Sequence, residues 1–203
     1  MDERIKIISS DLLDIDESVV SGFDEVRKGR LERIKSEEQR KEVYTSGVLI
    51  EQIRPEGAEL RYEKNGKPYF VNNGLAGQKL MSDENVKNIS ERYFNITHSS
   101  GKVICVWSDD VKVGADFEST ERIISPSIVR RLCTEKEKEY YNKISSPQEA
   151  NQWLLMLYTE KEAVSKLIGS GINMNFSNIN LDEYCVETKN IHGGYLSIAS
   201  YKQ

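Results

Sequence analysis

Cysteine is scarce in this sequence, and the three cysteines lie far apart. Cys105, Cys133 and Cys185 are odd in number and lack the close pairing of a disulfide framework or a structural zinc site. We therefore expect free thiols that serve mainly as structural side chains.

Long hydrophobic runs are lacking too. The longest apolar stretches, residues 103–107 and 153–158, are far shorter than the roughly 20 residues that cross a bilayer as a helix. The first six residues carry charges of both signs and lack the apolar core of a secretory signal. These absences predict a cytoplasmic protein without a membrane partner.

A surplus of positive charge is also missing, because 28 Lys and Arg stand against 33 Asp and Glu and give a formal net charge of −5. Binding to a nucleic-acid backbone depends on neutralising phosphates with basic side chains, so this balance argues against a nucleic-acid partner. Basic residues nevertheless gather in residues 27–41, where seven of the Lys and Arg occur. A local anion-binding surface is thus compatible with an acidic chain.

The remaining composition, 38% hydrophobic and 30% charged, is that of an ordinary globular protein. Residues 63–68 read as a turn, and a polar loop that we expect to be mobile follows up to about residue 92. The order strand, helices, strands occurs twice and indicates two similar halves, residues 1–110 and 111–203. Apolar periodicity predicts strands at 5–8, 93–98, 102–107, 111–118, 184–187 and 195–201, and helices within 27–53, from about 125, and at 149–168.

Two carboxylates share one face of the strand predicted at 111–118. Asp116 and Glu118 are two residues apart, and side chains at this spacing project from the same face of a strand. Like charges this close repel unless a cation lies between them, and Mg²⁺ favours one or two carboxylates together with waters and phosphates. An exposed polar strand face is the alternative interpretation.

A carboxylate and an ammonium group stand one turn apart on the predicted helix at 149–168. Glu162 and Lys166 have the four-residue spacing that stacks side chains along a helix. The helix is otherwise largely apolar, which favours a site over the alternative, a surface ion pair.

Histidine is rare, and one of the two lies at the end of a predicted strand. His98 is flanked by Thr97 and Ser99, whose hydroxyl groups suit phosphate oxygens, although a lone histidine is also common as a structural residue. His192, in a glycine-rich turn, is expected to be an exposed residue without a role.

Four short motifs follow one another along the chain in a characteristic order. They are Gly66-Lys67-Pro68; Phe94-Asn95-Ile96-Thr97-His98-Ser99; Gly114-Ala115-Asp116-Phe117-Glu118; and Tyr158-Thr159-Glu160-Lys161-Glu162-Ala163 followed by Lys166, Gly169 and Gly171. In this order they resemble the 4′-phosphopantetheinyl transferase superfamily, and specifically its Sfp (surfactin-synthetase-activating) type. Thr97 stands where the family usually has Ser, and Tyr158 where it usually has Trp.

The resemblance implies an α+β fold with two pseudo-symmetric α/β subdomains and the active site at their interface. The N-terminal half would contact the nucleotide of coenzyme A, and the C-terminal half would supply the metal site and the catalytic helix. A chain with both halves can complete its site alone, so we expect a monomer.

The resemblance also implies a role for each candidate residue. The implied Mg²⁺ ligands are Asp116, Glu118 and Glu162; the implied catalytic residues are Glu162, as general base, with Lys166 and His98; and the implied coenzyme A ligands are Lys67, Pro68, Thr97, His98, Arg33, Arg40 and Lys166. The implied reaction moves phosphopantetheine from coenzyme A to a serine of an acyl or peptidyl carrier protein.

Two alternatives remain compatible with the sequence. One is a non-catalytic relative that binds coenzyme A or a carrier protein. The other is a Mg²⁺-dependent phosphodiesterase or nuclease that uses the same acidic residues, which the acidic charge balance disfavours.

Overall fold

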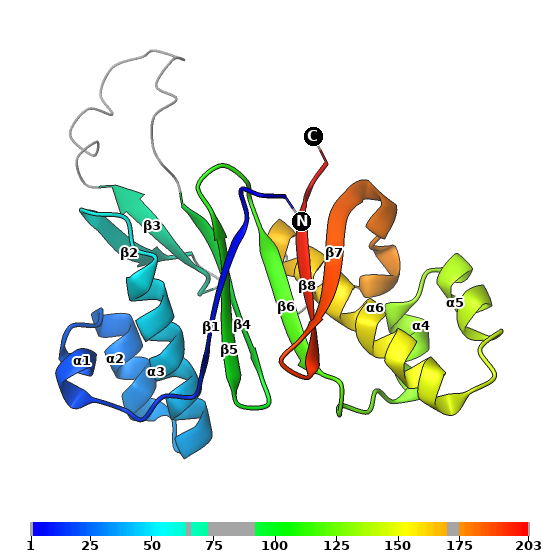
Figure 1. Ribbon diagram of the computed structural model, residues 1–203, viewed down its shortest axis with the longest axis horizontal. Coiled ribbons are helices and arrows are strands. Elements are labelled where there is room, and N and C mark those ends of the chain that lie inside the picture. The colour runs from blue at the N-terminus through cyan, green and yellow to red at the C-terminus, as the bar shows by residue number, and fades with distance from the viewer. Residues whose placement is uncertain (1, 64–65, 73–91, 170–174, 203) are drawn as a thin grey trace, which may run out of the picture.

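The computed structural model describes residues 2–63, 66–72, 92–169 and 175–202. The long loop expected to be mobile lies mostly outside these residues, as does Gly171 of the last motif. The described part contains two three-stranded antiparallel sheets side by side, with helices on their outer sides (Figure 1).

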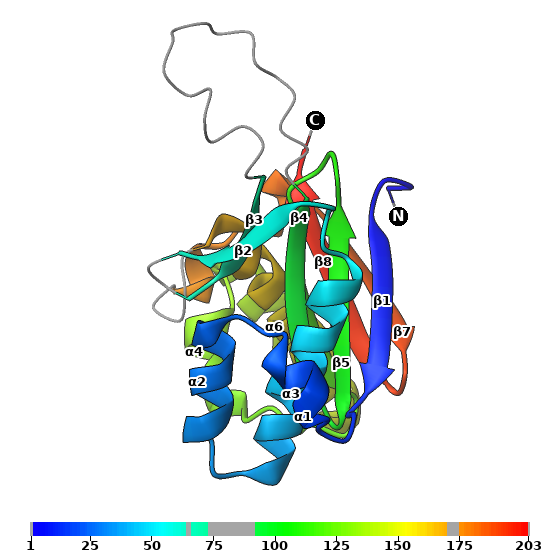
Figure 2. The same ribbon diagram turned by 90° about the vertical axis from the view of Figure 1, so that its left-hand side faces the viewer.

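The N-terminal half is built around a three-stranded sheet with the order β1-β5-β4. Strand β5, the last of the three along the chain, lies in the middle. Helix α3 packs against its outer side, α2 packs on α3, and a separate β2-β3 hairpin stands beside the helices (Figure 2). The elements are β1 (Lys6–Asp11), α1 (Glu17–Ser21), α2 (Glu25–Arg33), α3 (Glu37–Gln52), β2 (Ala58–Tyr62), β3 (Pro68–Asn72), β4 (Tyr93–Ser99) and β5 (Lys102–Ser108).

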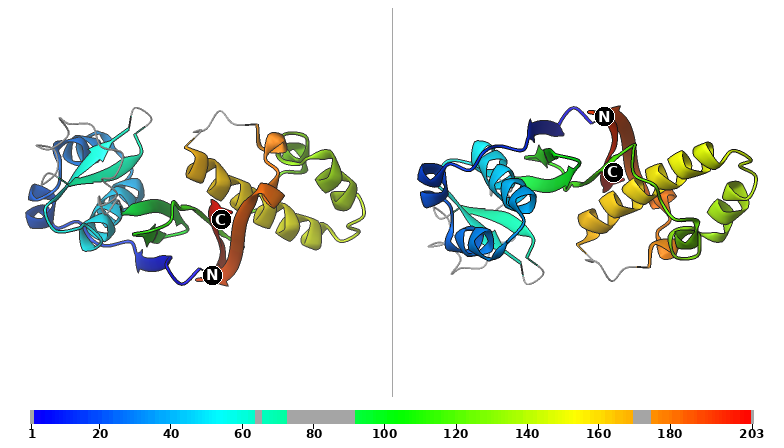
Figure 3. Two further views of the ribbon diagram at one scale, coloured as in Figure 1. Left: turned by 90° about the horizontal axis from the view of Figure 1, so that it is seen from above. Right: turned by 90° about the horizontal axis from the view of Figure 1, so that it is seen from below.

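The C-terminal half has a sheet with the same arrangement, in the order β6-β8-β7. Strand β8, the last of the three along the chain, again lies in the middle. The helices of the two halves lie at opposite ends of the molecule, and the strands lie between them (Figure 3). The elements are β6 (Gly114–Ser119), α4 (Val129–Leu132), α5 (Glu135–Tyr141), α6 (Pro147–Ile168), β7 (Tyr184–Ile191) and β8 (Gly194–Tyr201), with short 3₁₀ turns at Pro126–Ile128, Phe176–Asn178 and Leu181–Glu183.

Local sequence sets the bounds of the long helix α6. The Ser146 side chain accepts a hydrogen bond from the Glu149 amide, and Pro147 occupies the first turn, where its missing N–H costs nothing. Gly169 ends the helix in the left-handed conformation that glycine adopts without strain. The prediction of this helix is therefore confirmed, with a start two residues earlier than expected.

Strand β6 packs tightly against α6. A Cβ atom at Gly114 would collide with the backbone carbonyl of Ala163 and the backbone nitrogen of Leu167. Only glycine allows the strand to approach the helix this closely, and the approach brings the carboxylates of β6 near those of α6.

Side chains join the two sheets where β4 runs beside β6. Asn95 Oδ1, Thr97 Oγ1 and Ser99 Oγ accept hydrogen bonds from the backbone amides of residues 115, 117 and 119, at 3.2, 2.9 and 3.3 Å. These polar side chains satisfy buried backbone donors that a strand edge would otherwise leave unpaired. The seam therefore holds the two halves in a defined register.

Apolar residues of both sheets form a shared core on the other side of this seam. Ile104 and Val106 of β5 pack with Ala115 and Phe117 of β6 and with Leu196 of β8. Since these residues are essentially buried, the two sheets form one hydrophobic unit.

The predicted strands and the helices that carry the motifs are confirmed, with shifts of a few residues at their ends. Helices α1 and α5 and the hairpin strands that flank the turn at 63–68 were not predicted from the sequence. Helix α5 is short and highly charged, so its periodicity is weak, although Thr134 and Glu137 form a capping box at its start.

Candidate active site

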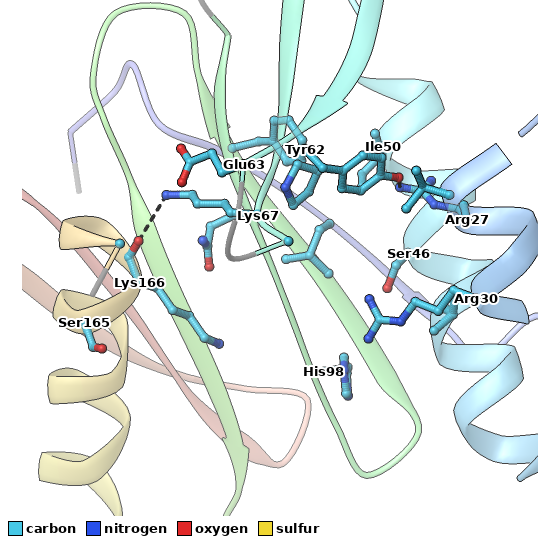
Figure 4. Close-up of a pocket in the computed structure, with 18 of the residues that line it drawn as sticks. Arg27, Arg30, Ser46, Ile50, Tyr62, Glu63, Lys67, His98, Ser165 and Lys166 are labelled. Carbon is cyan, nitrogen blue, oxygen red and sulfur yellow. Dashed lines mark hydrogen bonds between the residues drawn. The ribbon is translucent and has the colours of Figure 1, made fainter. Parts of the chain in front are cut away.

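A cleft of about 740 Å³ opens between the two halves. Its walls come from α2, α3, the β2-β3 hairpin, β4 and the C-terminal end of α6 (Figure 4). Among the described residues, its charged lining side chains other than histidine are Arg27, Arg30, Arg33, Lys67 and Lys166 against Glu63 and Glu162. The cleft is thus basic although the chain is acidic, and it suits a ligand with several negative charges.

Asp116 lies beside the cleft, buried between β4 and α6. Its Oδ1 accepts a hydrogen bond from Lys166 Nζ at 2.6 Å and one from the Thr97 hydroxyl at 3.2 Å. Within the part of the chain that the structure describes, its other oxygen, Oδ2, is buried and has no hydrogen-bond partner. A buried carboxylate oxygen without a donor is costly and marks a position where a cation would be stabilising.

Glu118 and Glu162 are linked by a chain of polar contacts. Glu118 forms an ion pair with Arg122, whose guanidinium group lies 4.9 Å from the centre of the Tyr158 ring. The Tyr158 hydroxyl in turn donates to Glu162 Oε1 at 3.1 Å. The hydroxyl of Tyr158 thus places a hydrogen-bond donor on one of the two glutamates.

Burial and mutual repulsion raise the pKa of both glutamates. For Glu162 the larger cause is burial, followed by the negative charge of Asp116. For Glu118 it is also burial, partly offset by its hydrogen bond to Arg122. The same burial, with the nearby Glu162, raises the pKa of Tyr158 to about 12. The shifts indicate that burial and the neighbouring carboxylates outweigh the nearby cations Lys166 and Arg122.

The donor set tests the predicted magnesium site. Among the described residues, no group of three or more His, Cys, Asp or Glu is arranged closely enough to hold a metal ion. Asp116 instead pairs with Lys166, and Glu118 with Arg122. The unpaired Asp116 Oδ2 and the raised pKa values of both glutamates fit an additional cation. Mg²⁺ ligation by Asp116, Glu118 and Glu162 therefore stays a prediction. The chemistry of these three side chains is compatible with it.

His98, Lys67 and Pro68 line the cleft, as does Lys166. Lys67 Nζ donates to the backbone carbonyl of Lys166 at 3.1 Å and so ties the hairpin turn to the end of α6 (Figure 4). Burial lowers the pKa of Lys67, because the charged ammonium group is less well solvated there.

The basic segment reaches the cleft through three arginines, only one of which was singled out. Arg33 lines the cleft, whereas Arg40 is not among the described residues that do. Arg27 and Arg30 line it as well and were overlooked. Their three-residue spacings, 27, 30 and 33, place all three on one side of α2, a signal that the sequence already contained.

Thr97 lies in the seam and is not among the described residues that line the cleft. It is only 3% exposed; its hydroxyl donates to Asp116 Oδ1 and accepts from the Phe117 amide. A hydroxyl with both partners supplied within the protein is poorly placed to bind a phosphate. The structure places the Thr97 hydroxyl against Asp116, and its expected contact with coenzyme A stays a prediction.

We expect Thr97→Val to lower the free energy of unfolding by about 1–3 kcal/mol, because it leaves the buried Phe117 amide without an acceptor. Thr97→Ser keeps the hydroxyl and should lose much less. Urea unfolding of the two variants against the parent protein measures the difference; equal midpoints for Val and Ser would show that the hydroxyl contributes nothing to the seam.

A basic cleft with a desolvated acidic group beside it is the kind of site that suits a phosphate-rich ligand. Comparison with known proteins specifies this class. Residues 112–201 match the model of a family described as the 4′-phosphopantetheinyl transferase superfamily. The resemblance inferred from the motifs is therefore confirmed at the level of the superfamily.

A relative from Marinomonas sp. (strain MWYL1), named holo-[acyl-carrier-protein] synthase, is 32% identical over 75 residues. The aligned part is 37% of this chain and 58% of the relative, so the match spans little more than half of that protein. Within the described ranges, no helix combines the length and the apolar character that a membrane span requires.

Proposed function

We propose that this protein is a 4′-phosphopantetheinyl transferase of the Sfp type, which moves the phosphopantetheine arm of coenzyme A to a serine of an acyl or peptidyl carrier protein and releases 3′,5′-ADP. The observation that carries the proposal is the basic cleft itself. Residues of all four motifs line it or lie directly beside it, although they are far apart in the sequence.

The two halves are proposed to be pseudo-symmetric subdomains with the active site at their interface. The identical strand order of the two sheets supports this division, as does the position of the cleft between α2, α3 and α6. Because one chain carries both halves, we propose that it acts as a monomer, and that it does so in the cytoplasm.

The cleft offers separate places for the two ends of coenzyme A. Arg27, Arg30 and Arg33 of α2 would bind the phosphorylated nucleotide, with Val26, Ile50 and Phe94 as apolar neighbours. Lys67 and Lys166 lie across the cleft and would face the pyrophosphate, with His98 between (Figure 4). These cations would stabilise charge that develops on the leaving 3′,5′-ADP.

Glu162 is the proposed general base. The serine oxygen of the carrier protein attacks the phosphorus atom that bears the pantetheine arm, the bond from that phosphorus to the oxygen of 3′,5′-ADP breaks, and the serine proton passes to Glu162. A pKa raised by burial suits a carboxylate for this task, because it makes the group a stronger base. Mg²⁺ held by Asp116, Glu118 and Glu162 would neutralise negative charge on the pyrophosphate.

Intact-mass spectrometry of an apo carrier protein tests the proposal. Incubation with this protein, coenzyme A and Mg²⁺ should add one phosphopantetheine, and EDTA should prevent the gain. If several acyl and peptidyl carriers gain nothing although coenzyme A binds, the protein is the non-catalytic relative instead.

A further inference from the structure

The imidazole of His98 is held from behind by a carboxylate of α3. His98 Nδ1 lies 3.2 Å from Glu42 Oε1, and the Glu42 side chain is only 17% exposed. His98 lines the cleft, whereas Glu42 is not among the described residues that do. The ring of His98 is thus a direct link between Glu42 and a ligand in the cleft.

This contact fixes which ring nitrogen meets the cleft. A ring nitrogen beside a carboxylate is the one expected to carry the proton, and this position belongs to Nδ1, which leaves Nε2 for a ligand. An imidazole on a strand end that is about half exposed would otherwise rotate freely between orientations. The carboxylate of Glu42 restricts that rotation.

We propose that Glu42 is a positioning residue that orients His98 toward the phosphates of coenzyme A. The inference rests on the proposed function, because it assumes that coenzyme A occupies the cleft. His98 stands between Lys166 on α6 and Arg30 on α2, where a fixed imidazole reaches a ligand bound by both (Figure 4). Glu42 couples α3 of the N-terminal half to that position.

The orientation of the ring can be measured without any ligand. The chain has two histidines, so the ring nitrogen signals of a ¹⁵N-histidine sample are assigned with one variant, His192→Asn. We expect Nδ1 of His98 to carry a proton in the parent protein and Glu42→Ala to shift that nitrogen signal. An unchanged His98 signal in Glu42→Ala would overturn the contact itself.

The effect on the ligand is measured by calorimetric titration with coenzyme A. Glu42→Ala should weaken binding about tenfold, and Glu42→Gln, which keeps an acceptor, should weaken it much less. In the His98→Ala background, Glu42→Ala should have no further effect, because the group it orients is gone. Glu38→Ala, one turn earlier on α3 and exposed, is the matched control and should leave binding unchanged.

The possible failures are distinguishable. If Glu42→Ala weakens binding equally with and without His98, Glu42 acts independently of the ring and the inference is wrong. The inference is also wrong if Glu42→Ala binds coenzyme A as tightly as the parent. If the parent protein itself does not bind coenzyme A, the proposed function fails, and with it this role of Glu42.

Discussion

Replacing Glu162 with glutamine should lower the rate of phosphopantetheine transfer about 10³-fold, within the range that loss of a general base causes. Glutamine has nearly the same shape and keeps an oxygen that accepts the hydrogen bond from Tyr158. It cannot take a proton from the carrier serine or contribute charge to a cation site. Initial rates of carrier modification at saturating coenzyme A measure the loss.

The same substitution should leave the fold intact and raise its stability at neutral pH. The pKa of Glu162 is raised in the folded protein, so the folded state holds the proton more tightly than the unfolded chain does. The ionised carboxylate therefore destabilises the fold above its folded pKa, and this cost disappears below the unfolded value of about 4.3. The melting temperature of Glu162→Gln should exceed that of the parent at pH 7, and the difference should shrink as the pH falls through this window.

Glu149→Gln is the matched control for this pair of measurements. Glu149 lies in the first turn of the same helix and is exposed, so its charge is solvated and remote from the cleft. We expect Glu149→Gln to transfer phosphopantetheine at the rate of the parent protein and to show no gain in melting temperature. A Glu162→Gln variant with full transfer activity would refute the assignment of the general base.

Much of the proposed site could be found from the sequence because its chemistry lies in short motifs on regular elements. The alternation of a strand places Asp116 and Glu118 together, and a helical repeat places Glu162 above Lys166. Both features depend only on local geometry. The long helix was equally accessible, since Pro147 and Gly169 mark its ends.

The contacts across the molecule could not be predicted in this way. Glu42 and His98 are 56 residues apart and meet only because α3 packs against the sheet that contains β4. Thr97 illustrates the same limit: the sequence supplies a hydroxyl next to His98, but the alternation of β4 turns it into the seam and leaves His98 facing the cleft. Local spacing identifies the residue, and tertiary packing decides its partner.

Lys161→Met should lower the free energy of unfolding by about 3 kcal/mol, the largest stability effect that we expect. Lys161 is fully buried, and its ammonium group contacts Glu137 Oε2 at 2.6 Å and the carbonyl oxygens of Leu132 and Phe176 at 2.9 and 3.1 Å. Methionine fills the space but leaves the Glu137 charge and two carbonyl groups without this donor. The ammonium joins α4, α5 and the 3₁₀ turn at Phe176–Asn178 to α6, so their packing depends on it.

Lys166→Met, five residues further along the same helix, provides the contrast. Its side chain is 30% exposed and its ammonium group contacts Asp116 at the cleft, so we expect a strong loss of transfer with a smaller loss of stability. Lys161→Met should show a large loss of stability, while each folded molecule transfers phosphopantetheine at the normal rate. Urea unfolding and single-turnover rates on both variants separate the two roles. If Lys161→Met unfolds at the same urea concentration as the parent, the buried ammonium is not what holds the C-terminal helices together.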